Sequence, residues 1–200
     1  TTPTNPGEVV NMLDPGKRMS RDGRFIAFDS FADLAGEHGN ANQTSFALYV
    51  FDASLATNAF RRVGSRSTAD TAAQGGDVQH YPGFTDYDVA GTPRTLLLET
   101  RLNIKPDGTI PTTAADGLNP HELRPTQIYT YQLDQPPSSA IFNRLTKFPI
   151  STAFLASTQP LPSDTSVRMA FNLSLTEIGT GNPDLSAESF YLLKPVVTDT

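Results

Sequence analysis

The segment that decides the fold is SRDGRFIAFDS, residues 20–30. In it a polar Asp-Gly turn leads into a short apolar strand that ends on a small polar residue. Two weaker copies follow, in which Thr85-Asp86 leads into residues 95–100 and Ser163-Asp164 leads into residues 167–172. A repeat made only of short strands favours a radial β array over a helical solenoid.

The second half of the unit repeats as well. Aligning Ser30, Thr100 and Ser174 gives spacings of 70 and 74 residues. An aromatic strand follows in each unit, around Tyr49, Tyr129 and Tyr191, and outer strands follow at residues 60–63 and 142–146. Each unit is therefore predicted to hold four strands, beginning with an inner strand that ends near the Ser/Thr-Asp turn.

We predict an all-β fold in one domain, residues 1–200: a partial β-propeller of about three four-stranded antiparallel blades. The blades span approximately residues 8–64, 75–147 and 150–200. Helical periodicity is poor, and the one short candidate, residues 52–59, is interpreted as a connection between strands. Short strands between frequent turns also fit a β-sandwich, which is the structural alternative.

Composition excludes several classes of function. A net charge of −6 and a pI near 4.9 argue against nucleic-acid binding, which needs a basic face. The absence of cysteine excludes disulfides and thiolate metal sites. No apolar run is long enough to cross a bilayer as a helix.

Residues 20–28, with Tyr49-Val50-Phe51-Asp52 at the expected place, resemble the strand pattern of TolB-type, WD40-like β-propeller repeats. Residues 32–36 and 176–193 resemble a subset of these repeats with a Gly-Asn-rich loop before the third strand. The resemblance implies a bacterial periplasmic or extracellular protein that binds other proteins. It also implies rings of usually six or more blades, so three blades are expected to belong to a longer chain or an assembly.

No catalytic residue is predicted. The histidines His38, His80 and His121 have no partner at zinc-site spacing and are expected in exposed loops. Val63-Gly64-Ser65-Arg66-Ser67 is not a nucleophile elbow, because position 67 is not glycine. The carboxylates of Asp86 and Asp88 are expected to bond turn backbone.

One cation site is a hypothesis. Asn182, Asp184 and Glu188 offer side-chain oxygens within one loop, as calcium requires. The loop lacks the full calcium-loop pattern, so tight-turn hydrogen bonding is the alternative, and no other cofactor is predicted.

The repeated aromatic residues are predicted to pack between blades; they are Phe28, Tyr49, Phe51, Tyr129, Tyr131, Phe171 and Tyr191. Tyr81, Phe84 and Tyr87 break the repeat, so we expect them to be exposed and to bind a partner. The long loops at residues 35–44, 105–125 and 179–187 form a second candidate surface.

The favoured function is a non-enzymatic binding or structural protein, acting as an interaction scaffold or as an accessory subunit of a larger assembly. The periphery of a membrane complex is one expected place for such an assembly. The alternative is the substrate-binding propeller of a hydrolase or lyase, which would need ionisable residues converging at the axis. Two uncovered apolar flanks predict that residues 1–200 are not a well-behaved monomer. The cover would come from the rest of the chain, a second copy or other subunits.

Overall fold

The computed structural model describes residues 11–12, 18–39, 43, 45–66, 79–120, 125–148, 158–173 and 189–193. Within these residues the chain is all-β, as predicted: eleven strands form three antiparallel sheets. The helical element among them is the 3-10 turn η2 (Ala114–Asp116). No helix in the described part of the chain is long and apolar enough to cross a membrane.

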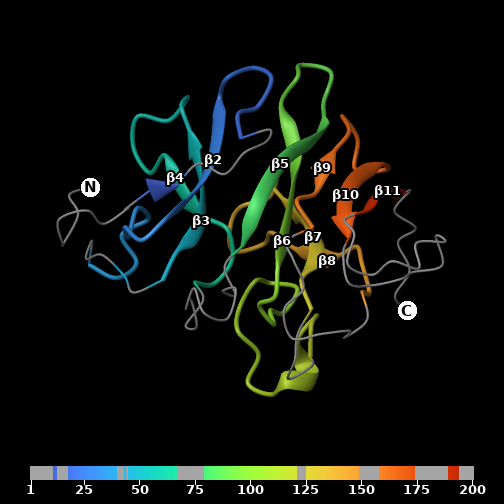
Figure 1. The fold of residues 1–200 in the computed structure, drawn as a ribbon. Coiled ribbons are helices and arrows are strands. Elements are labelled where there is room, and N and C mark those ends of the chain that lie inside the picture. Colours follow the sequence, from blue (N-terminus) through green and yellow to red (C-terminus); the bar gives the residue numbers. More distant parts are fainter. Residues whose placement is uncertain are drawn as a thin grey trace.

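The three sheets follow one another along the chain and lie side by side in Figure 1. Sheet A contains β1 (Asn11–Met12), β2 (Phe25–Ser30), β3 (Ala47–Asp52) and β4 (Phe60–Arg62). Sheet B contains β5 (His80–Tyr87), β6 (Pro93–Thr100), β7 (Gln127–Gln132) and β8 (Phe142–Arg144). Sheet C contains β9 (Leu161–Pro162), β10 (Met169–Leu173) and β11 (Ser189–Leu193). In every sheet, neighbouring strands are also neighbours in sequence.

Strand pairing fixes which residues are equivalent between the sheets. Phe28 pairs with Tyr49, Leu98 with Tyr129 and Phe171 with Tyr191. Ser30 is therefore equivalent to Thr100 and Leu173, so the spacings are 70 and 73 residues. The predicted alignment used Ser174 and was wrong by one position. It followed the hydroxyl side chains of Ser30 and Thr100, whereas the equivalent position at the end of β10 is occupied by Leu173.

The first turn of sheet B also differs from the prediction. Thr85 and Asp86 were expected in the turn, but β5 continues through them to Tyr87, and Thr85 is fully buried. The turn is built by Asp88, whose Oδ1 accepts hydrogen bonds from the backbone N–H groups of Ala90 and Thr92 at 2.9 Å each. Asp88 thus has the turn-bonding role expected of it.

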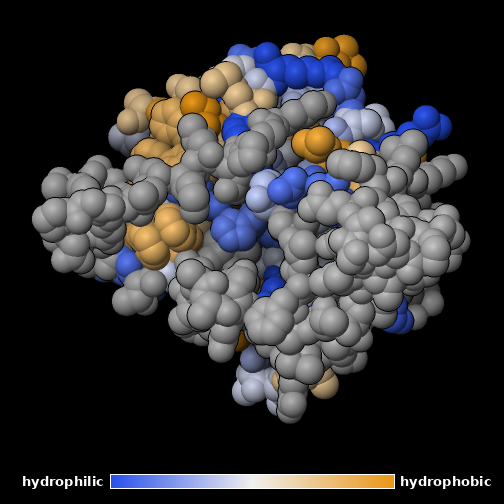
Figure 2. All heavy atoms as spheres, in the orientation of Figure 1, coloured by the Kyte–Doolittle hydropathy of each residue, from blue (hydrophilic) through white to orange (hydrophobic). Residues whose placement is uncertain are grey.

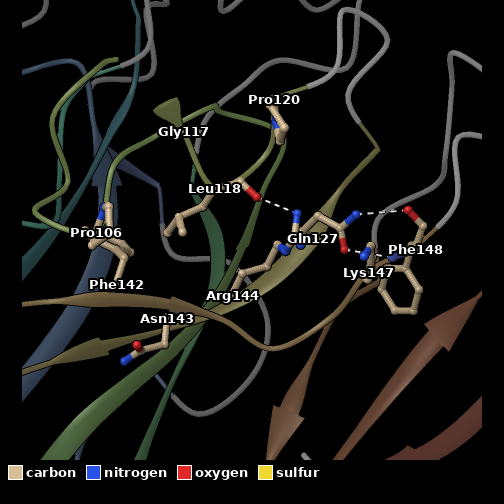
Figure 3. Close-up of a pocket in the computed structure, with 10 residues that line it drawn as sticks. All are labelled: Pro106, Gly117, Leu118, Pro120, Gln127, Phe142, Asn143, Arg144, Lys147 and Phe148. Carbon is tan, nitrogen blue, oxygen red and sulfur yellow. Dashed lines mark hydrogen bonds between the residues drawn. The ribbon is translucent and has the colours of Figure 1, made fainter. Parts of the chain in front are cut away.

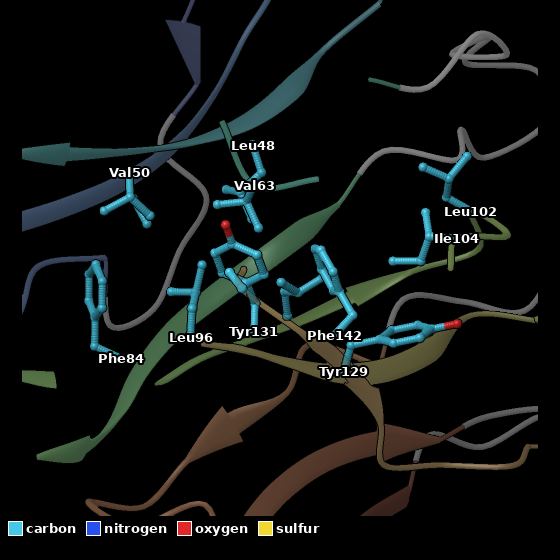
Figure 4. Packing of buried hydrophobic residues seen from close by; sticks show 13 residues of the cluster. Leu48, Val50, Val63, Phe84, Leu96, Leu102, Ile104, Tyr129, Tyr131 and Phe142 are labelled. Atoms are coloured by element: carbon cyan, nitrogen blue, oxygen red, sulfur yellow. The ribbon is translucent and has the colours of Figure 1, made fainter. Parts of the chain in front are cut away.

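Sheets A and B share one apolar core (Figure 4). Sheet A contributes Ala27, Leu48 and Val50, and sheet B contributes Leu96, Leu98, Tyr129 and Tyr131 among others. The ring of Phe142 lies against Gly64 and Gly108, where an added Cβ would come within 2.9 and 2.8 Å of ring carbons. Both glycines have φ above +70°, so backbone conformation and space both require glycine at these positions.

A second cluster joins sheets B and C. It consists of Leu97, Ile128, Phe148, Met169 and Phe171, with the rings of Phe148 and Phe171 5.4 Å apart. The predicted packing of repeat aromatic residues between sheets is confirmed for Tyr129, Tyr131 and Phe171, whereas Tyr49 is buried on the outer face of sheet A against Phe28. Phe28 and Phe51 are only half-buried, and the side chain of Tyr191 lies outside the described part.

Candidate functional site

A buried carboxylate joins sheet A to sheet B. Asp29, next to the end of β2, is fully buried and lies 2.8 Å from Nδ1 of His80, the first residue of β5. The expectation of an exposed loop histidine is wrong for His80, because this contact holds its ring on the inner strand of the next sheet. His38 is exposed as expected, and His121 lies outside the described residues.

The same position joins sheet B to sheet C. Glu99 is the equivalent of Asp29, and its Oε2 accepts hydrogen bonds from the backbone N–H groups of Thr158 and Gln159 at 2.7 and 2.9 Å. The Thr158 hydroxyl donates to the same oxygen at 2.5 Å. These partners occupy the place that His80 has in sheet B. The contact to a carboxylate of the preceding sheet thus lies at the first residue of β5 and just before the start of β9.

The backbone beside this contact repeats too. Tyr81 and Gln159 adopt left-handed conformations, with φ of 49° and 45°, and each is followed by a proline. Non-glycine residues seldom adopt this conformation unless the surroundings enforce it. The carboxylate contact and the left-handed residue before proline thus occur together at both junctions. We therefore interpret the carboxylate contact as one that holds neighbouring sheets together.

Sequence reasoning missed Asp29 and Glu99, although a signal was present. Acidic residues are depleted within strands, yet an acid precedes both Ser30 and Thr100 at the end of the repeated apolar strand. An acid retained at the same position of two repeats, inside an otherwise apolar strand, indicates a buried partner.

The turns between first and second strands of the three sheets meet at one edge, at the top of Figure 1. We call residues 20–24, 87–93 and 163–168 the short-turn rim. Arg21 of sheet A forms an ion pair with Asp164 of sheet C, and its guanidinium lies 4.5 Å from the centre of the Tyr87 ring of sheet B. All three sheets therefore contribute to one cluster of side chains.

Further contacts fix the geometry of this rim. The Ser166 N–H donates to Oδ1 of Asp86 at 2.6 Å, and the Thr85 hydroxyl donates to the carbonyl of Ser163 at 2.9 Å. Burial raises the pKa of Tyr87, so its hydroxyl remains protonated at neutral pH. Val89 and Val167 are exposed at the tips of the two adjacent turns. The rim thus combines Tyr, Arg and apolar side chains, a composition typical of protein interfaces.

The three predicted partner-binding residues have different positions. Phe84 is fully buried, with its ring 6.2 Å from that of Phe25, so its expected exposure was wrong: β5 directs it into the core between sheets A and B. Tyr87 is half-buried at the short-turn rim. Tyr81 is half-buried at the opposite end of β5, 5.6 Å from the guanidinium carbon of Arg18.

A pocket of about 460 Å³ lies beneath the long loop between β6 and β7 (Figure 3). Its apolar wall contains Leu118, Phe142 and Phe148, and its charged lining residues are Arg144 and Lys147. The charged lining is therefore basic, and among the described lining residues there is no pair of carboxylates such as a glycosidase needs.

Buried hydrogen bonds hold the wall of this pocket. Gln127 donates to the carbonyl of Phe148 at 3.0 Å and accepts from Thr146 and Phe148. Across the loop, Asn103 bonds Ala114 and Asn119 at 2.8 and 2.9 Å while its side chain fills the space beside Gly117. These hydrogen bonds hold the described part of the loop, residues 103–119, in a defined conformation.

The calcium hypothesis rests on Asn182, Asp184 and Glu188, which lie outside the described residues. Among the residues that are described, no group of three or more His, Asp or Glu side chains has the geometry to hold a metal ion.

The chain matches no family model and no curated protein.

Proposed function

We propose that the protein is a propeller-type interaction scaffold of the TolB-like kind, in which sheets A, B and C are consecutive blades. The inner strands support this arrangement because they contact one another in sequence order. Arg18 donates a hydrogen bond to the carbonyl of Pro82, and a Cβ at Gly83 would lie 2.6 Å from Pro162. Inner strands that meet around a common line are the defining feature of radial β arrays.

The short-turn rim is the proposed partner-binding surface, and one observation carries this proposal. Three sheets bring Arg21, Tyr87 and Asp164 together beside the exposed side chains of Val89 and Val167. An exposed apolar group beside Tyr and Arg favours binding of another folded protein. By the TolB resemblance, the partner is a protein of the periplasm or the cell exterior.

A hydrolase or lyase function is the second candidate, and its specific support is the Asp29–His80 pair. A carboxylate that orients a histidine is a common arrangement for a general base. In the equivalent contact of the next sheet, Glu99 accepts hydrogen bonds from the backbone N–H and the hydroxyl of Thr158. This repetition supports a structural role for the pair and favours the scaffold.

The test is site-specific photo-crosslinking in the cells that produce the protein. A benzoylphenylalanine at Val89 should give a discrete protein adduct, while the same probe at Leu55, 48% exposed on a distant outer turn, should not. Equal adducts at both positions, or none at Val89, would contradict binding at the rim. An activity that His80→Gln abolishes without loss of folding would instead favour the enzyme.

A further inference from the structure

The outer face of sheet A, which points away from sheet B, has the composition of an interface between sheets. By strand pairing, Met19, Ile26, Phe28, Phe51 and Phe60 are equivalent to Phe84, Leu96, Leu98, Tyr131 and Phe142 of sheet B. The five sheet B residues are buried beneath sheet A. Met19, in contrast, is 56% exposed where Phe84 is 0% exposed. Orange residues also extend over the part of Figure 2 where Figure 1 shows β4 and the turn before it.

The aromatic members of this face form one continuous group. The ring of Phe60 lies 6.3 Å from Phe28 and 5.1 Å from Phe51. All three are only half-buried, so their exposed parts form an apolar surface on one flank of the row of sheets. Exposed apolar surfaces of this kind mark interaction sites.

The outer face of sheet C, at the other end of the row, corresponds to the faces of sheets A and B that pack against the following sheet. Leu161 and Ala170 are equivalent to Gly83 and Leu97, which sheet C covers in sheet B. Leu161 is 49% exposed and Ala170 is half-buried. This face therefore has the position that sheets A and B use to contact the following sheet.

A polar group on sheet C completes the comparison. Asn172 is equivalent to Asp29 and Glu99, the carboxylates that contact the following sheet. Its Nδ2 donates to Gln159 at 3.2 Å, while its Oδ1 is shielded from solvent and has no hydrogen-bond partner among the described residues. Buried polar atoms normally have partners, so Asn172 keeps an unsatisfied acceptor, below the surface, at the position where the other two junctions receive donors.

We propose that a second copy of this chain covers these faces, with sheet C of each copy packed on the outer face of sheet A of the other. This inference rests on the proposed blade arrangement and names its partner. One chain carries both complementary faces, and both repeat the type of contact already present between sheets A and B and between B and C. Two such contacts related by a two-fold axis would close a ring of six sheets, as heterologous contacts can.

The charge distribution is compatible with self-association through the outer faces of sheets A and C. The chain has a net charge of −6, but the positions named on the two faces carry no charged side chain. The contact would therefore bury apolar area without placing like charges together, and area removed from water supplies the driving force.

Sedimentation of the intact protein over a wide concentration range tests the proposal. The expected result is a species of twice the chain mass. Met19→Glu and Leu161→Glu should each weaken the dimer at least about tenfold, because a charge would then be buried at both contacts. Val89→Glu, at the short-turn rim, is the matched control and should leave dimerisation unchanged. Both interface positions are half exposed, so the substitutions are compatible with folding of the monomer.

Mixing the two interface variants gives a sharper readout. Met19→Glu keeps an intact sheet C face and Leu161→Glu keeps an intact sheet A face, so the mixture should form one-to-one heterodimers through a single contact. A monomeric wild type, open chains longer than a dimer, or dimers that persist in both variants would overturn the proposal. A monomer in which Val89 still gives a discrete cross-linked partner would overturn the dimer and leave the scaffold function standing.

Discussion

The junction between sheets A and B differs from the junction between sheets B and C in what holds it together. Among the described residues, the first buries a cluster of thirteen apolar and aromatic residues and the second a cluster of five. The polar contacts also differ in kind: Asp29 contacts a histidine ring, whereas one oxygen of Glu99 accepts hydrogen bonds from two backbone N–H groups and a hydroxyl. Equivalent carboxylates in the repeat therefore keep their place while the groups that they contact change.

The largest expected effect lies in the apolar junction. Phe84→Ala removes a fully buried ring between sheets A and B, and the resulting cavity should lower the free energy of unfolding by about 3–5 kcal/mol. Chemical denaturation would measure it. Val89→Ala, at an exposed turn, should change stability by less than about 0.5 kcal/mol. A similar small loss for Phe84→Ala would contradict its assignment to the core.

The polar junction provides the next effect. Glu99→Ala leaves three donors without their acceptor and should cost about 3 kcal/mol, since unsatisfied buried donors are each expensive. Glu99→Gln keeps the size and one acceptor oxygen and should cost clearly less. Asp29→Ala should also cost less, because the His80 side chain is 27% exposed and can bond water. Equal losses at Asp29 and Glu99 would remove the difference between the junctions.

An ion pair within sheet A gives a smaller, pH-dependent effect. Arg24 donates two hydrogen bonds to Asp52, at 2.8 and 2.7 Å, and these hold the pKa of the carboxyl at about 2, below its usual 3.8. A lowered native pKa stabilises the fold above the unfolded value, and the contribution is lost as pH falls from about 4 towards 2.

Asp52→Asn should therefore destabilise the protein by roughly 1 kcal/mol at neutral pH, since the pair is partly solvated. Denaturation of both proteins from pH 7 downwards measures this difference. It should shrink below pH 4, and a difference that is constant with pH would show that charge is not its origin.

The smallest effect is expected at the short-turn rim. Arg21→Ala breaks the ion pair with Asp164, but both side chains are about half exposed, so the loss should be under about 1 kcal/mol. Its effect on partner cross-linking at Val89 should be larger than its effect on stability. A loss comparable with that of Glu99→Ala would show that the rim holds the sheets together.

Local sequence patterns predicted much of the fold. The Asp-Gly turn and alternating apolar residues placed β2, and the aromatic runs placed β3, β7 and β11 near their observed bounds. The pattern around Thr85 failed because a buried hydroxyl in a strand resembles a turn residue in sequence. The predicted exposure of Phe84 was wrong for a related reason. A residue outside the repeat pattern can still face the core when a bulge, here between His80 and Gly83, shifts the strand register.

The candidate sites were less predictable, for a physical reason. The contacts of Asp29 with His80 and of Arg21 with Asp164 join residues far apart in sequence, and depend on how whole sheets pack. Neither composition nor local spacing reports that packing. Equivalence between repeats does report it, since the strand registers place Glu99 and Asn172 at the position of Asp29.

The long loop between β6 and β7 suggests a use in protein engineering. Residues 101–126 connect these strands, whereas residues 31–46 connect the equivalent strands β2 and β3, and the flanking registers are the same. Connection length thus varies without disturbing the strands, and added length costs little closure entropy. Thr112 and Thr113 are exposed and precede the Asn103–Ala114 hydrogen bond that fixes the rest of the loop. A foreign peptide inserted between them would be displayed at a site whose anchors on both sides remain intact.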